Sequence, residues 1–319
     1  LAVCLFVRTG YAQETVGVIE RPVIDGPWTQ IAGDPDLGDY TSPGQQPVDF
    51  GVWQAADGTW QLWSCIRKTK CGGNPRLFYR WEGKSLTSPD WKPMGIAMEA
   101  DAKLGETPGG LQAPHVIKVG DRYLMFYGDW GDICLAESSD GKHFARVLDE
   151  NGRPQLFSGP MTNTRDAMVL PVGDTYYCYY TAHTPDKKSK HDCAVFCRTS
   201  KDLKTWSEPV MVSSGGDADP KSDWYGGSCE CPFVVRRGGR YYLFRNQVYG
   251  ERALNTQYCS TDPLYFGIDD DSLCIGTLPV AAPEIVLHEG QYYIVSLLPS
   301  LKGIQVARMK WVPVEEKTA

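Results

Sequence analysis

Five stretches of the chain share one pattern of apolar and polar positions. Each has two or three apolar residues, a short polar turn that contains glycine, and then an aromatic-rich run. They read VDFGVWQAADGTWQLWSC, QAPHVIKVGDRYLMFYGD, RDAMVLPVGDTYYCYYTA, ECPFVVRRGGRYYLFRNQ and AAPEIVLHEGQYYIVSLL. Asp-Gly and Gly-Asp turns between such runs join antiparallel strands, so each stretch predicts a β-hairpin. Helical periodicity is scarce throughout the chain.

The hairpins recur at a spacing that suits the blades of a propeller. Aligned on the position that is proline in three of them, they are separated by 64, 53, 65 and 51 residues, at Phe50, Pro114, Ala167, Pro232 and Pro283. Four short strands occupy about this length. Runs that end in Ser-x-Asp (ESSDGKHF, RTSKDLKTW, CSTDPLYF) predict outer strands, and VARMKW is expected to be the last one.

These repeats predict an all-β fold, a single-domain five-bladed β-propeller over residues 13–319. The segment VGVIERPVI near the N-terminus is expected to close the ring against the last blade. Two rivals are an ordinary β-sandwich with similar hairpins and a six-bladed sialidase, whose blade motif is similar to Ser-x-Asp-x-x-x-Trp. Five matching units favour the propeller over the sandwich. The count of five, without an evident arginine cluster, argues against the sialidase.

The N-terminus and the cysteines indicate an oxidising compartment. Residues 1–12, LAVCLFVRTGYA, are apolar at first and end in a small-x-small pattern, which predicts the remnant of a secretory signal peptide; a frayed tail is the alternative. Ten of the eleven cysteines follow this segment. We therefore expect a secreted or periplasmic protein with disulfides, and Cys178 and Cys197, on either side of a polar turn, are one candidate pair.

Charge and composition exclude several classes of partner. The net charge is −7 and the chain has no run rich in lysine and arginine, which argues against binding to nucleic acid or to an anionic membrane. No other apolar run is long enough to span a bilayer. The chain has no CxxC pair or His/Cys cluster, so no metal and no cofactor are expected. A cation in the channel and the oligomeric state stay open.

Three of the five hairpins open with an acid. The first strand of each propeller blade lines the central channel, so side chains at matching openings converge although they are far apart in the sequence. The two positions before the proline-like site are Val48–Asp49, Gln112–Ala113, Arg165–Asp166, Glu230–Cys231 and Ala281–Ala282. We predict that Asp49, Asp166 and Glu230 meet at one mouth of the channel. Cleavage of a glycosidic bond needs such a set of acids.

Each of these acids also has a structural alternative. Asp49 could hydrogen-bond a neighbouring loop, Asp166 could pair with Arg165, and Glu230 could form a salt bridge with an arginine such as Arg245. Three acids at matched positions favour the functional interpretation.

Two short motifs carry a resemblance to known enzymes. RDA at 165–167 and ECP at 230–232 resemble the Arg-Asp-Pro and Glu-Cys-Pro motifs of five-bladed glycoside hydrolases of families 32 and 68, with family 43 as the wider relative. The resemblance implies that Asp49 is the nucleophile or general base, Asp166 stabilises the transition state and Glu230 donates the proton. PVDFG lacks the Asn-Asp-Pro-Asn-Gly form of fructan-cleaving members, so the resemblance does not extend to fructose specificity. The expected single-domain architecture resembles family 43 or an unassigned branch more than family 32, whose members have a C-terminal β-sandwich.

Several other side chains near the openings are candidate sugar contacts. They are Arg165, Gln112, His115, Trp53, Trp130, Trp224 and Tyr225. Trp224 and Tyr225 precede Glu230 in DWYGGSCE and are the preferred stacking platform. His115 and the other aromatic side chains have a structural alternative, as hydrogen-bonded or packed residues of the blades.

The sequence thus predicts a secreted glycoside hydrolase that acts on oligo- or polysaccharides, with furanosides or plant or algal-type glycans as the expected substrates. For this role Glu230 should have a raised pKa and Asp49 an ordinary or lowered one. Two alternatives stay open. One is a propeller that binds carbohydrate without cleaving it, and the other is a glycoside phosphorylase, which would need several basic residues beside the acids where only Arg165 is placed.

Overall fold

The structure is a computed structural model that describes residues 16–183, 193–216 and 229–315. The predicted signal-peptide remnant at 1–12 and the predicted platform residues Trp224 and Tyr225 lie outside the described residues.

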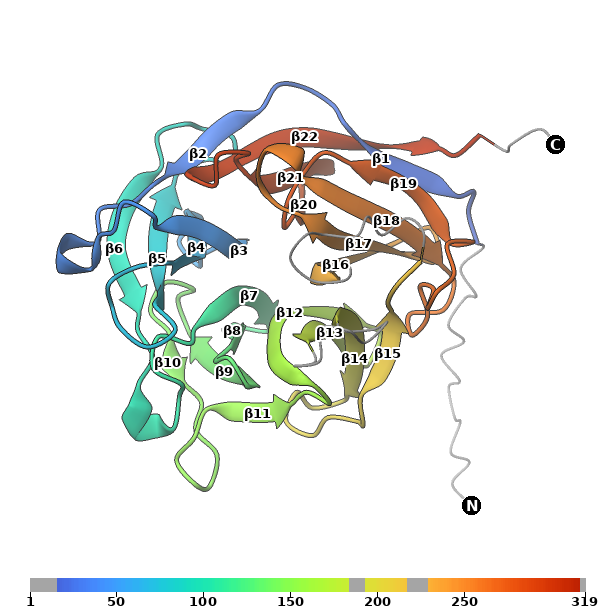
Figure 1. The fold of residues 1–319 in the computed structure, drawn as a ribbon. Helices are drawn as coiled ribbons and strands as arrows, with labels where there is room; N and C mark the ends of the chain where they lie inside the picture. Colours follow the sequence, from blue (N-terminus) through green and yellow to red (C-terminus); the bar gives the residue numbers. More distant parts are fainter. Residues whose placement is uncertain (1–15, 184–192, 217–228, 316–319) are drawn as a thin grey trace, which may run out of the picture.

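Five antiparallel sheets stand around a central axis (Figure 1). Each inner strand comes first in the sequence of its blade. Blade one contains β3 (Gln46–Gln54), β4 (Trp60–Arg67), β5 (Arg76–Gly83) and β6 (Lys92–Met98). Blade two contains β7 (Gln112–Val119), β8 (Arg122–Gly128), β9 (Asp132–Ser138) and, both paired with β9, β10 (Ala145–Arg146) and β11 (Gln155–Ser158).

The other three blades follow the same order. Blade three contains β12 (Thr162–Val172), β13 (Thr175–His183), β14 (Cys193–Ser200) and β15 (Val210–Ser213). Blade four contains β16 (Glu230–Arg237), β17 (Arg240–Val248), β18 (Leu254–Ser260) and β19 (Cys274–Leu278). Blade five contains β20 (Glu284–His288), β21 (Gln291–Leu297) and β22 (Gly303–Pro313). The predicted all-β, five-bladed propeller is confirmed, and the predicted hairpins are the first two strands of the blades.

The ring closes through the N-terminal strands. β1 (Glu20–Ile24) pairs antiparallel with β22, and β2 (Thr29–Gly33) pairs with the same strand further along (Figure 1). The Glu20 carboxylate also accepts a hydrogen bond from Arg237 Nε of blade four at 2.6 Å. The predicted closure by the segment around β1 is confirmed, and β2 extends it.

The Ser-x-Asp endings belong to the third strand of a blade, and a fourth strand lies outside them. β9, β14 and β18 each end at the serine of this pattern. In blade two the Ser138 hydroxyl donates to Asp140 Oδ1 at 2.7 Å, and the same carboxylate oxygen accepts the backbone N–H of Lys142. The pattern therefore caps a turn at the end of an outer strand, as predicted, and one further strand of the blade follows it.

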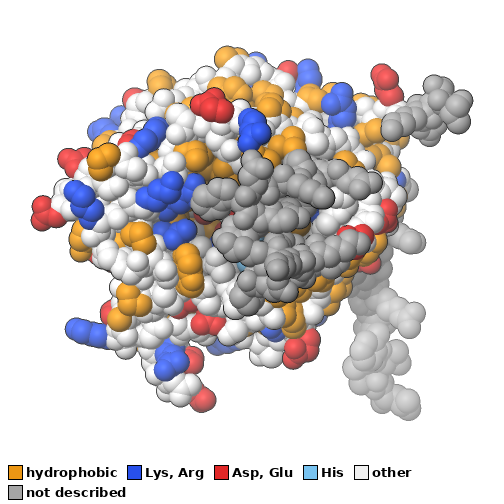
Figure 2. Space-filling model, in the orientation of Figure 1, with side chains coloured by type: hydrophobic (Ala, Val, Ile, Leu, Met, Phe, Trp, Pro, Cys, Tyr) orange, Lys and Arg blue, Asp and Glu red, His pale blue; other side chains and the backbone are white. Residues whose placement is uncertain are grey.

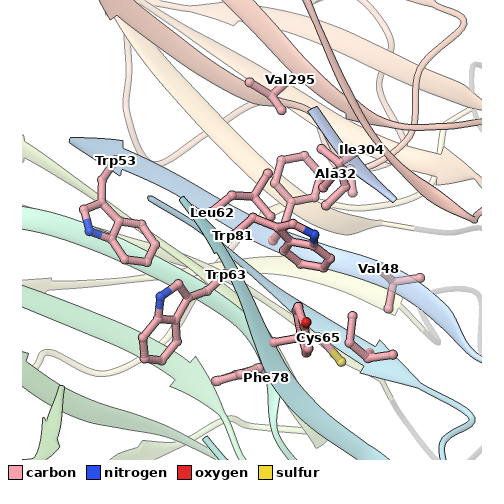
Figure 3. Close-up of a cluster of buried hydrophobic side chains, with 14 of the residues drawn as sticks. Ala32, Val48, Trp53, Leu62, Trp63, Cys65, Phe78, Trp81, Val295 and Ile304 are labelled. Carbon is pink, nitrogen blue, oxygen red and sulfur yellow. The ribbon is translucent and has the colours of Figure 1, made fainter. Parts of the chain in front are cut away.

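Aromatic side chains form much of the core between the blades. Figure 3 shows part of one cluster, in which Trp53, Trp63 and Phe78 pack together in blade one. The Trp53 indole N–H donates to the Gly141 carbonyl of blade two at 2.7 Å, and the residue is 7% exposed. Burying one large apolar side chain stabilises the fold by roughly 1.5–3 kcal/mol. Trp53, predicted as a sugar contact, is therefore a packing residue that joins two blades.

The ten cysteines of the described residues all carry free thiols. Cys178 lies opposite Arg198 in the β13–β14 ladder, whereas Cys197 lies opposite Tyr179. Because side chains alternate between the two faces of a sheet, this one-residue offset puts the two thiols on opposite faces. The predicted Cys178–Cys197 pair is wrong.

Acidic and basic side chains are interspersed around the face seen in Figure 2, without a large field of one sign among the described residues drawn there. Within the described ranges, no helix is long and apolar enough to cross a membrane.

Candidate active site

Each inner strand opens with a residue in the left-handed backbone region. The φ angles are 36° at Asp49, 45° at Ala113, 59° at Asp166, 46° at Cys231 and 47° at Ala282. In the first four blades the strand register shifts at this point, which marks a β-bulge. Such backbone is uncommon for residues other than glycine and is held by the surrounding sheet. The bulges re-aim one side chain per blade.

The five residues with left-handed backbone line one small cavity on the propeller axis. His115, Met168 and Glu284 line it as well. The structure thus brings together Asp49 of blade one and Asp166 of blade three. The bulge residue of blade four is Cys231, so Glu230, one position earlier, lies beside this cavity and not in its wall.

Cys231 is hydrogen-bonded to both aspartates. Its thiol donates to Asp49 Oδ1 at 3.2 Å, and its backbone N–H donates to Asp166 Oδ2 at 3.0 Å. The Tyr249 hydroxyl, just after β17, donates to the same Asp49 oxygen at 3.2 Å and lies 3.2 Å from the Cys231 sulfur. Two side chains of blade four, Cys231 and Tyr249, therefore fix the orientation of the Asp49 carboxylate.

The Glu230 carboxylate faces blade three. Arg165 Nη2 donates to Glu230 Oε1, and His183 Nε2 lies 3.2 Å from the same oxygen. Arg165 Nε also lies 3.6 Å from Asp166 Oδ2, so one guanidinium contacts two of the predicted acids. Asp49, Asp166 and Glu230 thus belong to one network of hydrogen bonds and ion pairs, in which Cys231 links the two aspartates and Arg165 links Asp166 with Glu230.

Burial and neighbouring charges shift the pKa values of Asp166 in blade three and Glu230 in blade four in opposite directions. Burial raises the pKa of Asp166 to about 7, helped by the charges of Asp49 and Glu230 and opposed by Arg165. Burial also acts to raise the pKa of Glu230, but the charge of Arg165 and the hydrogen bond from His183 outweigh it and hold that pKa below its usual range. The predicted raised pKa at Glu230 is wrong; the raised acid is Asp166.

The remaining predicted contacts lie at different depths. Gln112 opens β7 and is 2% exposed. His115 lines the cavity, and burial lowers the pKa of its imidazole to about 4. Trp130 lies in the turn between β8 and β9, at the end of blade two where Gln112 also lies, with the Arg76 guanidinium 4.7 Å from its ring centre. Only Trp130 is partly accessible at the rim.

Sequence patterns did not single out two members of the network. His183 lies at the end of β13, one residue beyond the quoted repeat, and Tyr249 follows β17 outside every aligned position. A search for polar side chains just past the second strand of each blade would have found both.

Comparison with known proteins bears on the fold. No family model matches the chain, and no curated protein sequence matches it. Among solved structures, a thermostable family-43 glycoside hydrolase superposes with a TM-score of 0.64 at 20% identity, covering 87% of this chain and 94% of its own. An endo-arabinase from Bacteroides thetaiotaomicron has a TM-score of 0.61 at 13% identity, over 88% and 99% of the two chains.

A third structure, of the GH43_1 enzyme from Xanthomonas citri complexed with xylotriose, has a TM-score of 0.61 at 14% identity and covers 91% of this chain and 96% of its own. The chain therefore has the five-bladed fold of family-43 glycoside hydrolases.

Proposed function

We propose that the protein is a glycoside hydrolase that cleaves its substrate with two carboxyl groups at the mouth of the propeller channel. The observation that carries this proposal is the network that joins Asp49, Asp166 and Glu230 through Cys231 and Arg165. Hydrolysis of a glycosidic bond needs one carboxyl group to protonate the leaving oxygen and a second to attack or to activate water. The shared fold with family-43 enzymes supports the proposal, although a fold by itself does not define an activity.

Asp49 is the proposed nucleophile or general base. It lines the cavity and is oriented by the Cys231 thiol and the Tyr249 hydroxyl, which both donate to its Oδ1. Asp166 lines the same cavity and is the proposed stabiliser of positive charge on the sugar ring in the transition state.

Glu230 is the proposed proton donor, so it must be protonated when substrate is bound. In the free protein the acid with the raised pKa is Asp166. Asp166 and Glu230 both contact Arg165, so the two acids titrate as a coupled pair. A glycosidic oxygen beside Glu230 favours the arrangement in which Glu230 holds the proton and Asp166 is ionised next to Arg165. Substrate binding would thus move the proton to the group that uses it.

The proposed substrates are oligo- or polysaccharides that contain pentoses or furanosides. The proposed location of the protein is outside the cytoplasm. A neighbouring structure named as an endo-arabinase and another complexed with xylotriose support a pentose-containing substrate. Trp130 with Arg76 above its ring offers an accessible aromatic face at the rim. Trp224 and Tyr225 remain proposed platform residues.

The first experiment is a hydrolysis panel of aryl arabinofuranosides, xylopyranosides and fructofuranosides together with arabinan, xylan and fructan. We expect turnover of at least one member by the wild type, a loss of roughly 100-fold or more in Asp49→Asn, and little change in the exposed control Asp121→Asn. Turnover that depends on added phosphate would indicate a phosphorylase instead.

A second candidate function is carbohydrate binding without cleavage. The observation that favours it is the contact of Glu230 with both Arg165 and His183, which holds the carboxylate ionised. This candidate predicts measurable binding of a glycan by the wild type and by Asp49→Asn, with no turnover of any substrate in the panel.

A further inference from the structure

Three potential metal-ligand atoms meet in the wall of the cavity. The proposed hydrolytic mechanism gives them no joint role. Asp49, Asp166 and Cys231 each offer one oxygen or sulfur atom, and these atoms all lie within 4.8 Å of one another. All three are bulge residues, from blades one, three and four. The shared backbone geometry, and not their order in the sequence, brings them together.

The Asp166 carboxylate has one oxygen that is available to a ligand. Its Oδ2 accepts the Cys231 N–H at 3.0 Å and faces Arg165. Its Oδ1 is buried and has no hydrogen-bond partner among the described residues, and the residue is 4% exposed and lines the cavity. A buried carboxylate oxygen without a partner is costly, and its position points to a group that the protein alone does not supply. Because Arg165 lies beside Oδ2, a cation would bind at Oδ1.

The donor set selects the kind of ion. Oxygen ligands alone suit Ca²⁺ and Mg²⁺, whereas a thiolate with two carboxylates suits a borderline-soft ion such as Zn²⁺. Ligand atoms on a tetrahedral zinc lie roughly 3.3–3.6 Å apart, so small side-chain rotations would bring these three onto one ion. The Tyr249 hydroxyl, 3.2 Å from both Asp49 Oδ1 and the Cys231 sulfur, is placed to orient the ligands from outside.

We propose that Asp49, Asp166 and Cys231 form a zinc-binding site, with a fourth coordination position open to water. On binding, Zn²⁺ replaces the thiol proton of Cys231 and any proton held by the Asp166 carboxyl group, and these protons pass to the solvent. This site differs from the sequence-based expectation of no metal, which considered only cysteine and histidine spacings. It goes beyond the proposed hydrolase, and where that function holds, zinc at this place occupies Asp49 and Asp166 and inhibits hydrolysis.

The test uses Co²⁺ as a coloured substitute for Zn²⁺ on the full chain. We expect wild-type protein to develop a near-ultraviolet thiolate-to-cobalt charge-transfer band that disappears when Zn²⁺ is added. Cys231→Ser should abolish the band, and the control Cys71→Ser, which removes a partly exposed thiol in a loop of blade one, should keep it. Asp49→Asn and Asp166→Asn should each weaken Co²⁺ binding at least tenfold.

The proposal is overturned if the wild type shows no such band, or if the band persists in Cys231→Ser. Should Cys231→Ser fail to fold by circular dichroism, the two Asp→Asn variants decide, because unchanged Co²⁺ affinity in both would place the metal elsewhere. Inhibition of hydrolysis by Zn²⁺, reversed by a chelator, is a separate measurement that rests on the proposed function. The absorption band does not depend on any activity, so the two proposals fail independently.

Discussion

At the scale of single residues, two acids that contact the same arginine have pKa values shifted in opposite directions. Asp166 is 4% exposed and close to the other acids of the network, so burial dominates and its pKa is about 7. Glu230 receives direct contacts from both Arg165 and His183, which keep it ionised. Asp166 therefore keeps its proton up to about neutral pH, and we expect it to add a pH-dependent contribution to stability.

We expect Asp166→Asn to change the pH dependence of stability in a defined direction. The folded protein binds a proton at Asp166 up to about pH 7, whereas an unfolded chain releases it near pH 4. Asp166 therefore stabilises the fold most at low pH, and this contribution is lost as the pH rises from about 4 to 7. Glu230, with a lowered pKa, acts in the opposite sense, but only below about pH 4.

Chemical denaturation between pH 5 and 8 measures this effect. The free energy of unfolding of Asp166→Asn, relative to wild type, should increase by roughly 1–3 kcal/mol over that range. Asparagine tolerates the left-handed backbone at this position, so the variant should fold. The exposed control Asp121→Asn should show a difference that does not vary with pH. A constant difference for Asp166→Asn as well would contradict the raised pKa.

At the scale of the element, one residue with left-handed backbone near the start of each inner strand, which lies in a β-bulge in the first four blades, is what builds the site. This backbone conformation turns the residue before the proline-like position toward the axis in every blade, whatever that residue is. Two blades carry alanine there, two carry aspartate and one carries cysteine. The scaffold and the chemistry are therefore separable, because the backbone conformation repeats while the side chain varies.

Substitutions at Ala282 test how strongly this backbone is imposed. Ala282 has a φ of 47° and is 4% exposed. A β-branched side chain is strongly disfavoured in this region, so Ala282→Val should lower the free energy of unfolding by about 2 kcal/mol or more. Ala282→Gly removes a methyl group but relieves the backbone, and should lie within about 1 kcal/mol of wild type. Equal losses in the two variants would show that the backbone at Ala282 is not strained.

The repeat explains which parts of the site the sequence predicts. Aligning the hairpins on Pro114, Pro232 and Pro283 fixes the strand register, and with it the arrival of Asp49 and Asp166 at one cavity. The alignment does not reveal which of two adjacent residues a bulge turns inward, so the sequence could not separate Glu230 from Cys231.

The parts that the sequence did not predict depend on packing between blades. The ion pair of Arg165 with Glu230 crosses from blade three to blade four, and Tyr249 reaches blade one from the end of β17. Trp53 was expected at a sugar site because indole rings stack on sugars, yet its indole N–H bonds the neighbouring blade. Such contacts follow from the distance between blades, which no local pattern encodes.

At the scale of the whole molecule, ring closure joins the two ends of the described chain. β22 lies between β21 on one side and β1 and β2 on the other, so the last blade is completed by N-terminal strands (Figure 1). A propeller blade without its outer strand exposes an unpaired edge. The N-terminal segment should therefore belong to the same cooperative unit as the site on the axis.

The side chain of Ile31 tests this cooperativity. Ile31 in β2 is 2% exposed and belongs to the core, whereas Ile19, just before β1, is 39% exposed. Ile31→Ala should lower the free energy of unfolding by about 2–4 kcal/mol, and Ile19→Ala by less than about 1 kcal/mol. Unfolding followed by tryptophan fluorescence and by circular dichroism should give one transition in both variants. Separate transitions in Ile31→Ala would mean that the closure unfolds independently of the ring.

The central claim is that Glu230 donates the proton in a glycoside hydrolase site, and its most direct test is the dependence of Glu230→Gln on the leaving group. A poor leaving group needs protonation, whereas a good one departs without it. We predict that Glu230→Gln lowers kcat/KM by roughly 100-fold or more on substrates with a poor leaving group and by less than about tenfold on a dinitrophenyl glycoside of the same sugar. Equal losses on both substrates would contradict the assignment of Glu230 as the acid.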